Sequence, residues 1–151
     1  MNYIDILRSS AKETGNTVCM GLDPVLSALP DEEKGNKERI TSFFSQLFRR
    51  MRLEGSVPAA FKPNIGYYSS LDNPRAGDFS GSEALADVLD MIESFFPGIP
   101  VILDSKRADI ARSSANYAKE AFECWKADAV TISPYMGIDS VVPFCYEGKG
   151  V

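Results

Sequence analysis

Charged side chains follow a short hydrophobic run in VILDSKRADI, residues 101–110. Asp104 and Lys106 are two positions apart, and side chains at this spacing on a strand project from the same face. A carboxylate about 4 Å from an ammonium attracts it by about 4 kcal/mol at an effective dielectric constant near 20. Asp104 therefore favours the charged form of Lys106. A lysine kept charged in this way is suited to donating a proton and poorly suited to forming a Schiff base.

Similar polar residues follow the other hydrophobic runs, namely Asp23, Lys62 and Ser133. Each has an ordinary structural explanation: a turn or cap for Asp23, an edge strand ended by proline for Lys62, and the start of a turn for Ser133. The first motif could likewise be a surface ion pair followed by Asp109 as a helix N-cap. In a parallel barrel, however, the carboxyl ends of the strands meet at one mouth. Four such strand ends together favour a functional site.

The chain contains no histidine among its 151 residues. Ser-His and Cys-His nucleophile pairs and the common zinc sites are therefore excluded. The three cysteines, Cys19, Cys124 and Cys145, have no metal-ligand spacing and are expected to be reduced thiols. Acid–base chemistry must fall to Lys, Asp, Glu, Tyr or Cys.

Four apolar runs alternate with amphipathic stretches along the chain. Strands are expected over 17–22, 58–65, 100–104 and 128–133. Helices are expected near the N-terminus and over 36–53, 82–96, 110–126 and 138–146. This alternation is typical of βαβ units and a parallel sheet. Both a small doubly wound domain and half of a (β/α)8 barrel, which typically needs about 250 residues, fit the pattern. The ending YEGKGV predicts entry into another strand.

Composition argues against two kinds of partner. Lys and Arg total 16 against 21 Asp and Glu, giving a net charge of −5, whereas a nucleic-acid surface normally needs a basic patch. No apolar run approaches the roughly 20 residues of a membrane span, and the N-terminus lacks the layout of a signal peptide. We therefore expect a cytoplasmic protein that binds neither nucleic acid nor membrane.

Four motifs together resemble one enzyme family. GLDP, FKPNIGYY, LDSKRADI and DAVTISPYMGIDSVVPF occur in this order, and together they are similar to the longer bacterial form of orotidine 5′-phosphate decarboxylase. The resemblance implies an α/β fold of the (β/α)8 TIM barrel family, with residues 1–151 as the N-terminal portion of a single domain and only about the first four βα units present. It also implies decarboxylation of orotidine 5′-monophosphate to UMP in de novo pyrimidine biosynthesis, without a cofactor or metal.

The resemblance further implies a role for each candidate residue. Lys106 would protonate C6 of the nucleotide after carbon dioxide leaves, and Asp104 would lie beside the substrate carboxylate. Asp23 and Lys62 would bind ribose hydroxyls, and Ser133 would contact the pyrimidine ring.

A second set of residues would act across a homodimer interface. Asp109 would complete an alternating charged network with Lys62, Asp104 and Lys106, and it would do so in the neighbouring subunit's site. Ile110 and Ser113 would reach the same neighbouring site. Many relatives have Thr where this chain has Ser113, and serine keeps the hydroxyl.

The phosphate-binding residues of the family would lie beyond residue 151. We therefore expect this chain alone to be nearly inactive, as a truncated product or half of a cleaved barrel, with open edges at its first and fourth strands. Two other interpretations remain open. One is a Mg²⁺-dependent sugar-phosphate decarboxylase or synthase that shares the D-x-K-x-x-D motif, although Lys62 stands where those relatives have a Glu. The other is a non-catalytic half-barrel that assembles with another chain.

Overall fold

Four parallel strands run in sequence order through the computed structural model, which describes residues 2–151. They are β1 (Cys19–Gly21), β2 (Ala60–Lys62), β3 (Ile102–Arg107) and β4 (Ala129–Ile132). β1 pairs with β2 and β3 pairs with β4, both in parallel. Parallel bridges from Phe61 to Val101 and from Asn64 to Asp104 join the two pairs. The resulting order, 1-2-3-4, is the order of consecutive strands in a barrel wall.

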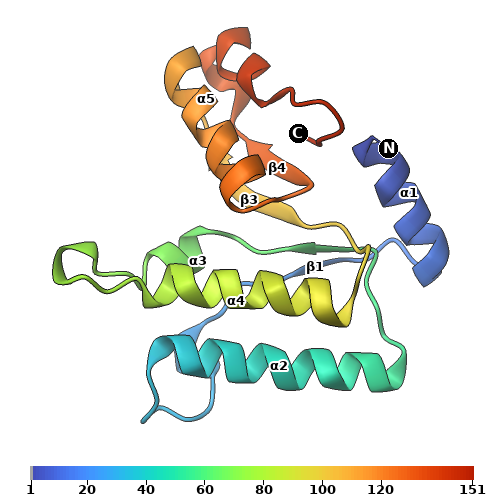
Figure 1. Cartoon of the computed structure of the whole chain (residues 1–151), viewed down its shortest axis with the longest axis vertical. Helices are drawn as coiled ribbons and strands as arrows, with labels where there is room; N and C mark the ends of the chain where they lie inside the picture. Colours follow the sequence, from blue (N-terminus) through green and yellow to red (C-terminus); the bar gives the residue numbers. More distant parts are fainter. Residues whose placement is uncertain (1) are drawn as a thin grey trace.

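Helices precede the first strand and connect the strands along the chain (Figure 1). They are α1 (Tyr3–Thr14), α2 (Asn36–Glu54), α3 (Gly66–Ser69), α4 (Ser80–Phe95) and α5 (Ala111–Lys119), which continues into a π-helical turn (Glu120–Cys124). α2 and α4 lie side by side against the β1–β2 half of the wall (Figure 1). None of the helices between residues 2 and 151 combines the length and apolar character needed to cross a bilayer.

A cluster of phenylalanines holds the helices on the strands. The helical spacing of Phe44 and Phe48 turns both rings inward from α2, and Phe48 is fully buried. Its ring centroid lies 5.5 Å from that of Phe61 on β2 and 5.3 Å from that of Phe96 after α4. One side chain thus connects two helical segments to a strand.

The end of the chain bears on two expectations. Gly150, the last residue of the Gly-Lys-Gly sequence, forms an isolated parallel bridge with Ala129, as expected for entry into another strand. The outer edge of β4 is paired at this one point, where Gly150 accepts from the amide of Val130 and donates to the carbonyl of Asp128. A Cβ atom at Gly150 would collide with the ring of Tyr3 on α1, so a larger residue would require that ring to move.

The expectation of a helix over 138–146 is wrong. The structure has two short 3₁₀ turns there, Ile138–Ser140 and Val142–Phe144. Gly137 precedes them with φ of 108°, and Pro143 has no amide proton to donate to a helical turn. The other expected helices and strands are present with shifted ends, and β3 continues to Arg107 rather than ending at residue 104.

We predict that Phe48→Ala lowers the free energy of unfolding by about 3–5 kcal/mol, because it leaves a cavity at the centre of the aromatic cluster. Urea unfolding followed by the fluorescence of the single tryptophan, Trp125, measures this change. Phe79→Ala is the control, since that ring is 49% exposed. Equal losses in the two variants would contradict the role of Phe48.

Candidate active site

A buried carboxylate at the carboxyl ends of the strands lies between two lysines. Asp104, on β3, is only 5% exposed. Its Oδ2 atom accepts from Lys62 Nζ of β2 at 2.7 Å, and its Oδ1 atom accepts from Lys106 Nζ at 2.6 Å. The hydroxyl of Thr131, on β4, donates to the same Oδ1 at 2.7 Å. The structure therefore brings together three of the predicted site residues and adds a fourth group.

Hydrogen bonds to lysines decide the charge of this carboxylate. Burial by itself would raise the pKa of Asp104, but the hydrogen bonds from Lys106, Lys62 and Thr131 outweigh it and hold the pKa well below its usual value. The hydrogen bond that Lys62 donates to Asp104 in turn raises the pKa of Lys62. Asp104 is thus ionised at neutral pH.

The two lysines differ in access to solvent. The side chain of Lys62 is 31% exposed and that of Lys106 is 61% exposed. The contact with Asp104 holds one side of the Lys106 ammonium, and its exposure leaves room for a ligand on the other side. An ammonium anchored in this way can face a group that develops negative charge.

The backbone between Asp104 and Lys106 is not a regular strand. Leu103 pairs with Val130 and Arg107 pairs with Ile132, so residues 104–106 face only the single residue Thr131. Lys106 has φ of +47°, a conformation that costs a non-glycine residue about 1–2 kcal/mol. The prediction that Asp104 and Lys106 share a face is confirmed by their contact, but a bulge produces it rather than simple alternation.

After the bulge, the strand is attached to its own helix. Arg107 points away from the lysines, and its guanidinium lies 5.0 Å from the ring centroid of Tyr117 on α5. Its Nη2 atom also lies 3.3 Å from the Glu120 carboxylate. These contacts fix the end of β3 from the outer side.

Asp23 and Ser133 lie at the same end of the sheet. The Asp23 carboxylate, which follows β1, accepts from the amide of Asn64 at 3.0 Å and so joins the ends of β1 and β2. Ser133, which follows β4, donates from its amide to the Arg107 carbonyl at 2.9 Å and from its hydroxyl to the Lys106 carbonyl at 3.3 Å. Both residues therefore border the lysine–carboxylate group.

Asp109, Ile110 and Ser113 are not joined to that group within the chain. Asp109 accepts from the amide of Ile110 at 2.7 Å, and no ion pair connects it to another residue of the described chain, 2–151. The expected N-cap role of Asp109 is wrong, because Ile110 occupies the N-cap position of α5. Ile110 is 61% exposed and Ser113 is half-buried in the first turn of α5.

Sequence reasoning missed Thr131. A β-branched residue inside DAVTIS has the pattern of an ordinary strand former, and nothing in its spacing indicates contact with residues 104–106. Its position opposite the bulge is visible only once β3 and β4 are paired.

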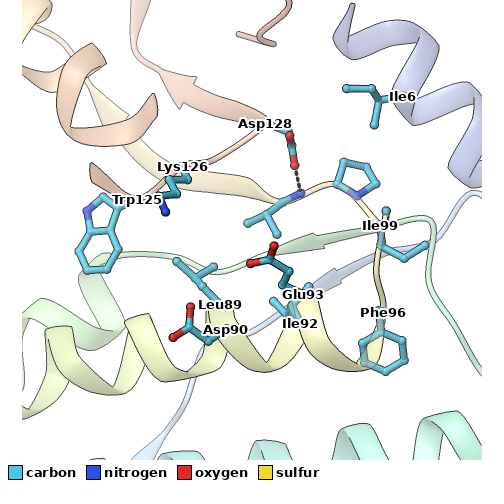
Figure 2. A pocket seen from close by; sticks show the side chains of 13 residues that line it. Ile6, Leu89, Asp90, Ile92, Glu93, Phe96, Ile99, Trp125, Lys126 and Asp128 are labelled. Carbon is cyan, nitrogen blue, oxygen red and sulfur yellow. Dashed lines mark hydrogen bonds between the residues drawn. The ribbon is translucent and has the colours of Figure 1, made fainter. Parts of the chain in front are cut away.

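A hollow of about 560 Å³ lies at the other end of the strands and is separate from this group (Figure 2). It runs between α4 and the segment before β4, with Leu89, Glu93 and Trp125 in its lining. Asp128 accepts from the amide of Val101 at 2.9 Å there, at the amino ends of β4 and β3 (Figure 2). This end of a barrel typically serves stability. Among residues 2–151, no cluster of His, Cys, Asp and Glu side chains is placed to hold a metal ion.

Comparison with known proteins agrees with this arrangement. A family model described as "Orotidine 5'-phosphate decarboxylase / HUMPS family" matches residues 16–150. The chain belongs to this family. It is 39% identical over 152 residues to the orotidine 5′-phosphate decarboxylase of Verminephrobacter eiseniae, with 99% of this chain and 51% of the relative covered. Identity to the enzyme of the same name from Cupriavidus metallidurans is 40% over 152 residues, with 100% and 52% covered.

Solved structures confirm the expected fold class. The chain superimposes on the OMP decarboxylase of Leishmania donovani with a TM-score of 0.75 and 33% identity, with 99% of this chain and 51% of that chain covered. It is thus an α/β portion of a TIM barrel, containing about the first four βα units. The chain spans about half the length of the curated relatives it matches.

We predict that Asp104→Asn lowers the free energy of unfolding by about 2 kcal/mol at pH 7, because two ammonium groups lose a charged acceptor. Folding lowers the pKa of Asp104, so its contribution is complete above the unfolded value of about 3.9 and declines as the pH falls below it. The difference between wild type and variant should therefore shrink progressively below about pH 4. Urea unfolding at pH 7 and at about pH 3 measures both free energies.

Asp90→Asn is the control for this experiment, because Asp90 is exposed on α4 beside the opposite hollow. Its effect at pH 7 should stay within about 0.5 kcal/mol. A difference between wild type and Asp104→Asn that stays constant down to pH 3 would show that Asp104 is not held ionised by its partners.

Proposed function

We propose that this chain carries the reacting groups of an orotidine 5′-monophosphate decarboxylase, which converts its nucleotide substrate to UMP and carbon dioxide without a cofactor. The observation that supports this most is the buried Asp104 carboxylate between the ammonium groups of Lys62 and Lys106. It lies at the carboxyl ends of parallel strands in a chain whose relatives carry that enzyme name.

The chemistry follows from these charges. The bond between C6 and the carboxylate breaks, carbon dioxide leaves, and the electron pair remains on C6. Lys106 then transfers a proton from its ammonium to C6, and the neutral amine regains a proton from solvent. Placing the substrate carboxylate near Asp104 is unfavourable, whereas a carbanion near Lys106 is favourable. The site therefore favours the transition state over the bound substrate.

The remaining residues would bind the nucleotide around this pair. Asp23 and Lys62 would hold the ribose hydroxyls, and Ser133 would contact the pyrimidine ring beside Lys106. In support, the hydrogen bonds of Asp23, Lys62 and Ser133 all lie at the carboxyl ends of the strands.

Asp109, Ile110 and Ser113 would serve the site of a second subunit in a homodimer. In support, Asp109 makes no ion pair with the lysines of its own chain, residues 2–151, and Ile110 is exposed. We expect such a homodimer in the cytoplasm, with a small nucleotide as its ligand and without nucleic-acid or membrane partners. The net charge of −5 is unfavourable for nucleic acid.

The proposed activity belongs to a complete barrel. A hollow of about 490 Å³ lies beside β1, with Val18, Met20 and Leu47 in its lining, and Val18 is 57% exposed. An apolar strand edge of this kind favours pairing with a further strand. We therefore propose that the chain alone turns over the nucleotide poorly. The assays below use a completed barrel, in which the matching second half of a relative is joined to this chain.

We predict that Lys106→Ala lowers turnover of orotidine 5′-monophosphate by about 10³-fold or more in the completed barrel, because it removes both the proton donor and the charge that stabilises C6. Loss of the substrate's absorbance measures the rate. Lys12→Ala on the exposed face of α1 is the control and should keep wild-type turnover. Wild-type turnover in Lys106→Ala would contradict the mechanism, and an inactive wild-type barrel would contradict the function.

The same assay distinguishes the proposed reaction from that of a Mg²⁺-dependent sugar-phosphate decarboxylase or synthase. Turnover that continues in EDTA supports the cofactor-free reaction, because no step above needs a cation. A requirement for Mg²⁺, or activity toward a sugar phosphate only, would favour the alternative enzyme class.

We further predict that mixing Lys106→Ala and Asp109→Ala subunits restores activity. In a twofold dimer with shared sites, each mixed dimer has one site with both residues intact, so random mixing gives about a quarter of wild-type turnover. Each variant by itself should remain nearly inactive. If the mixture is no more active than the separate variants, Asp109 does not act across the interface.

A further inference from the structure

The hydroxyl of Thr131 forms hydrogen bonds with three parts of β3. Its Oγ1 atom accepts from the amides of Ser105 and Lys106, both at 3.1 Å, and donates to Asp104 Oδ1 at 2.7 Å. A hydroxyl has one proton to donate and two lone pairs to accept with. Thr131 therefore uses its whole hydrogen-bonding capacity on the three consecutive residues that contain the reacting pair.

This contact replaces the strand pairing that the bulge removes. Residues 104–106 face only one β4 residue, so the amides of Ser105 and Lys106 lie outside the regular ladder between β3 and β4. The same amides have Thr131 Oγ1 as their acceptor. The hydroxyl thus supports the left-handed conformation of Lys106, φ +47°, from which the ammonium reaches Asp104.

Further contacts from β4 hold the same segment. The Ser105 hydroxyl donates to the Thr131 carbonyl at 3.3 Å, and the Ser133 hydroxyl donates to the Lys106 carbonyl at 3.3 Å. The branched Cβ atom of threonine also restricts the rotation of its side chain. Thr131 is the only one of these residues that contacts both the backbone of Lys106 and the carboxylate of Asp104.

We propose that Thr131 is a positioning residue that holds the Lys106 ammonium and the Asp104 carboxylate in register for the reaction. This inference rests on the proposed function of that pair. Thr131 acts through the two charged residues and not on the nucleotide. Without its hydroxyl, the amides of Ser105 and Lys106 lose their acceptor, and Asp104 loses one of its three donors. The proton donor is then no longer fixed relative to C6.

The test compares Thr131→Val with Thr131→Ser in the completed barrel. Valine keeps the shape and removes the hydroxyl, and we expect kcat to fall about 10²-fold because a small displacement of a reacting group is costly. We expect KM to stay within about twofold, because Asp23 and Lys62, which would bind the ribose, are unchanged. Serine restores the hydroxyl and should return kcat to within about threefold of wild type.

Thr41→Val is the matched control, because the Thr41 hydroxyl bonds only to carbonyls within α2. It should leave kcat and KM unchanged. Wild-type kcat in Thr131→Val, or a Thr131→Ser variant as slow as Thr131→Val, would overturn the proposal. A fall in kcat that merely follows a loss of folded protein, measured by thermal unfolding, would also overturn it.

A second readout is independent of turnover. Amide hydrogen exchange followed by NMR should be at least tenfold faster at Ser105 and Lys106 in Thr131→Val than in wild type, with the amides of α2 unaffected. Unchanged exchange at both residues would overturn the positioning role even if the barrel is active. If the wild-type barrel does not decarboxylate the nucleotide, the proposed function fails, and exchange still decides whether Thr131 holds this segment.

Discussion

The ionised carboxylate of Asp104 is the constraint on which the site depends. It is buried, and a buried charge is tolerated only when paired and hydrogen-bonded. β2 supplies Lys62, β3 supplies Lys106, and β4 supplies the hydroxyl of Thr131. Because these donors come from three neighbouring strands, the strands must end at matching heights for the charge to be neutralised.

The helices provide that alignment. Phe48 of α2 lies against Phe61 of β2 and Phe96 after α4, so the apolar layer sets where β2 and β3 lie relative to each other. On the far side of β3, Arg107 is attached to Tyr117 and Glu120. The apolar core and the charged group are thus two consequences of the same strand placement.

The pairing of Asp104 with Lys62 and Lys106 also bears on the chemistry proposed for the site. Lys62 and Lys106 compensate the charge of Asp104, and a second carboxylate placed nearby would compete for the same ammonium groups. In the proposed reaction, loss of that second carboxylate would relieve the repulsion and leave Lys106 facing the new carbanion. A fixed arrangement of charges is what such electrostatic stabilisation requires, since it avoids rearrangement during the reaction.

The sequence alone determined the alternation of strands and helices, the placement of Asp23, Lys62, Asp104 and Lys106 at strand ends, and the family. These features depend on local periodicity and on short motifs, which are readable without a structure. Only the tertiary structure decided how Lys106 reaches Asp104, because the bulge, the positive φ and the Thr131 hydroxyl depend on the register between β3 and β4. It likewise showed that Ile110, not Asp109, occupies the N-cap position of α5 and that 138–146 forms 3₁₀ turns. Register and caps depend on which distant residues meet, and linear spacing does not encode that.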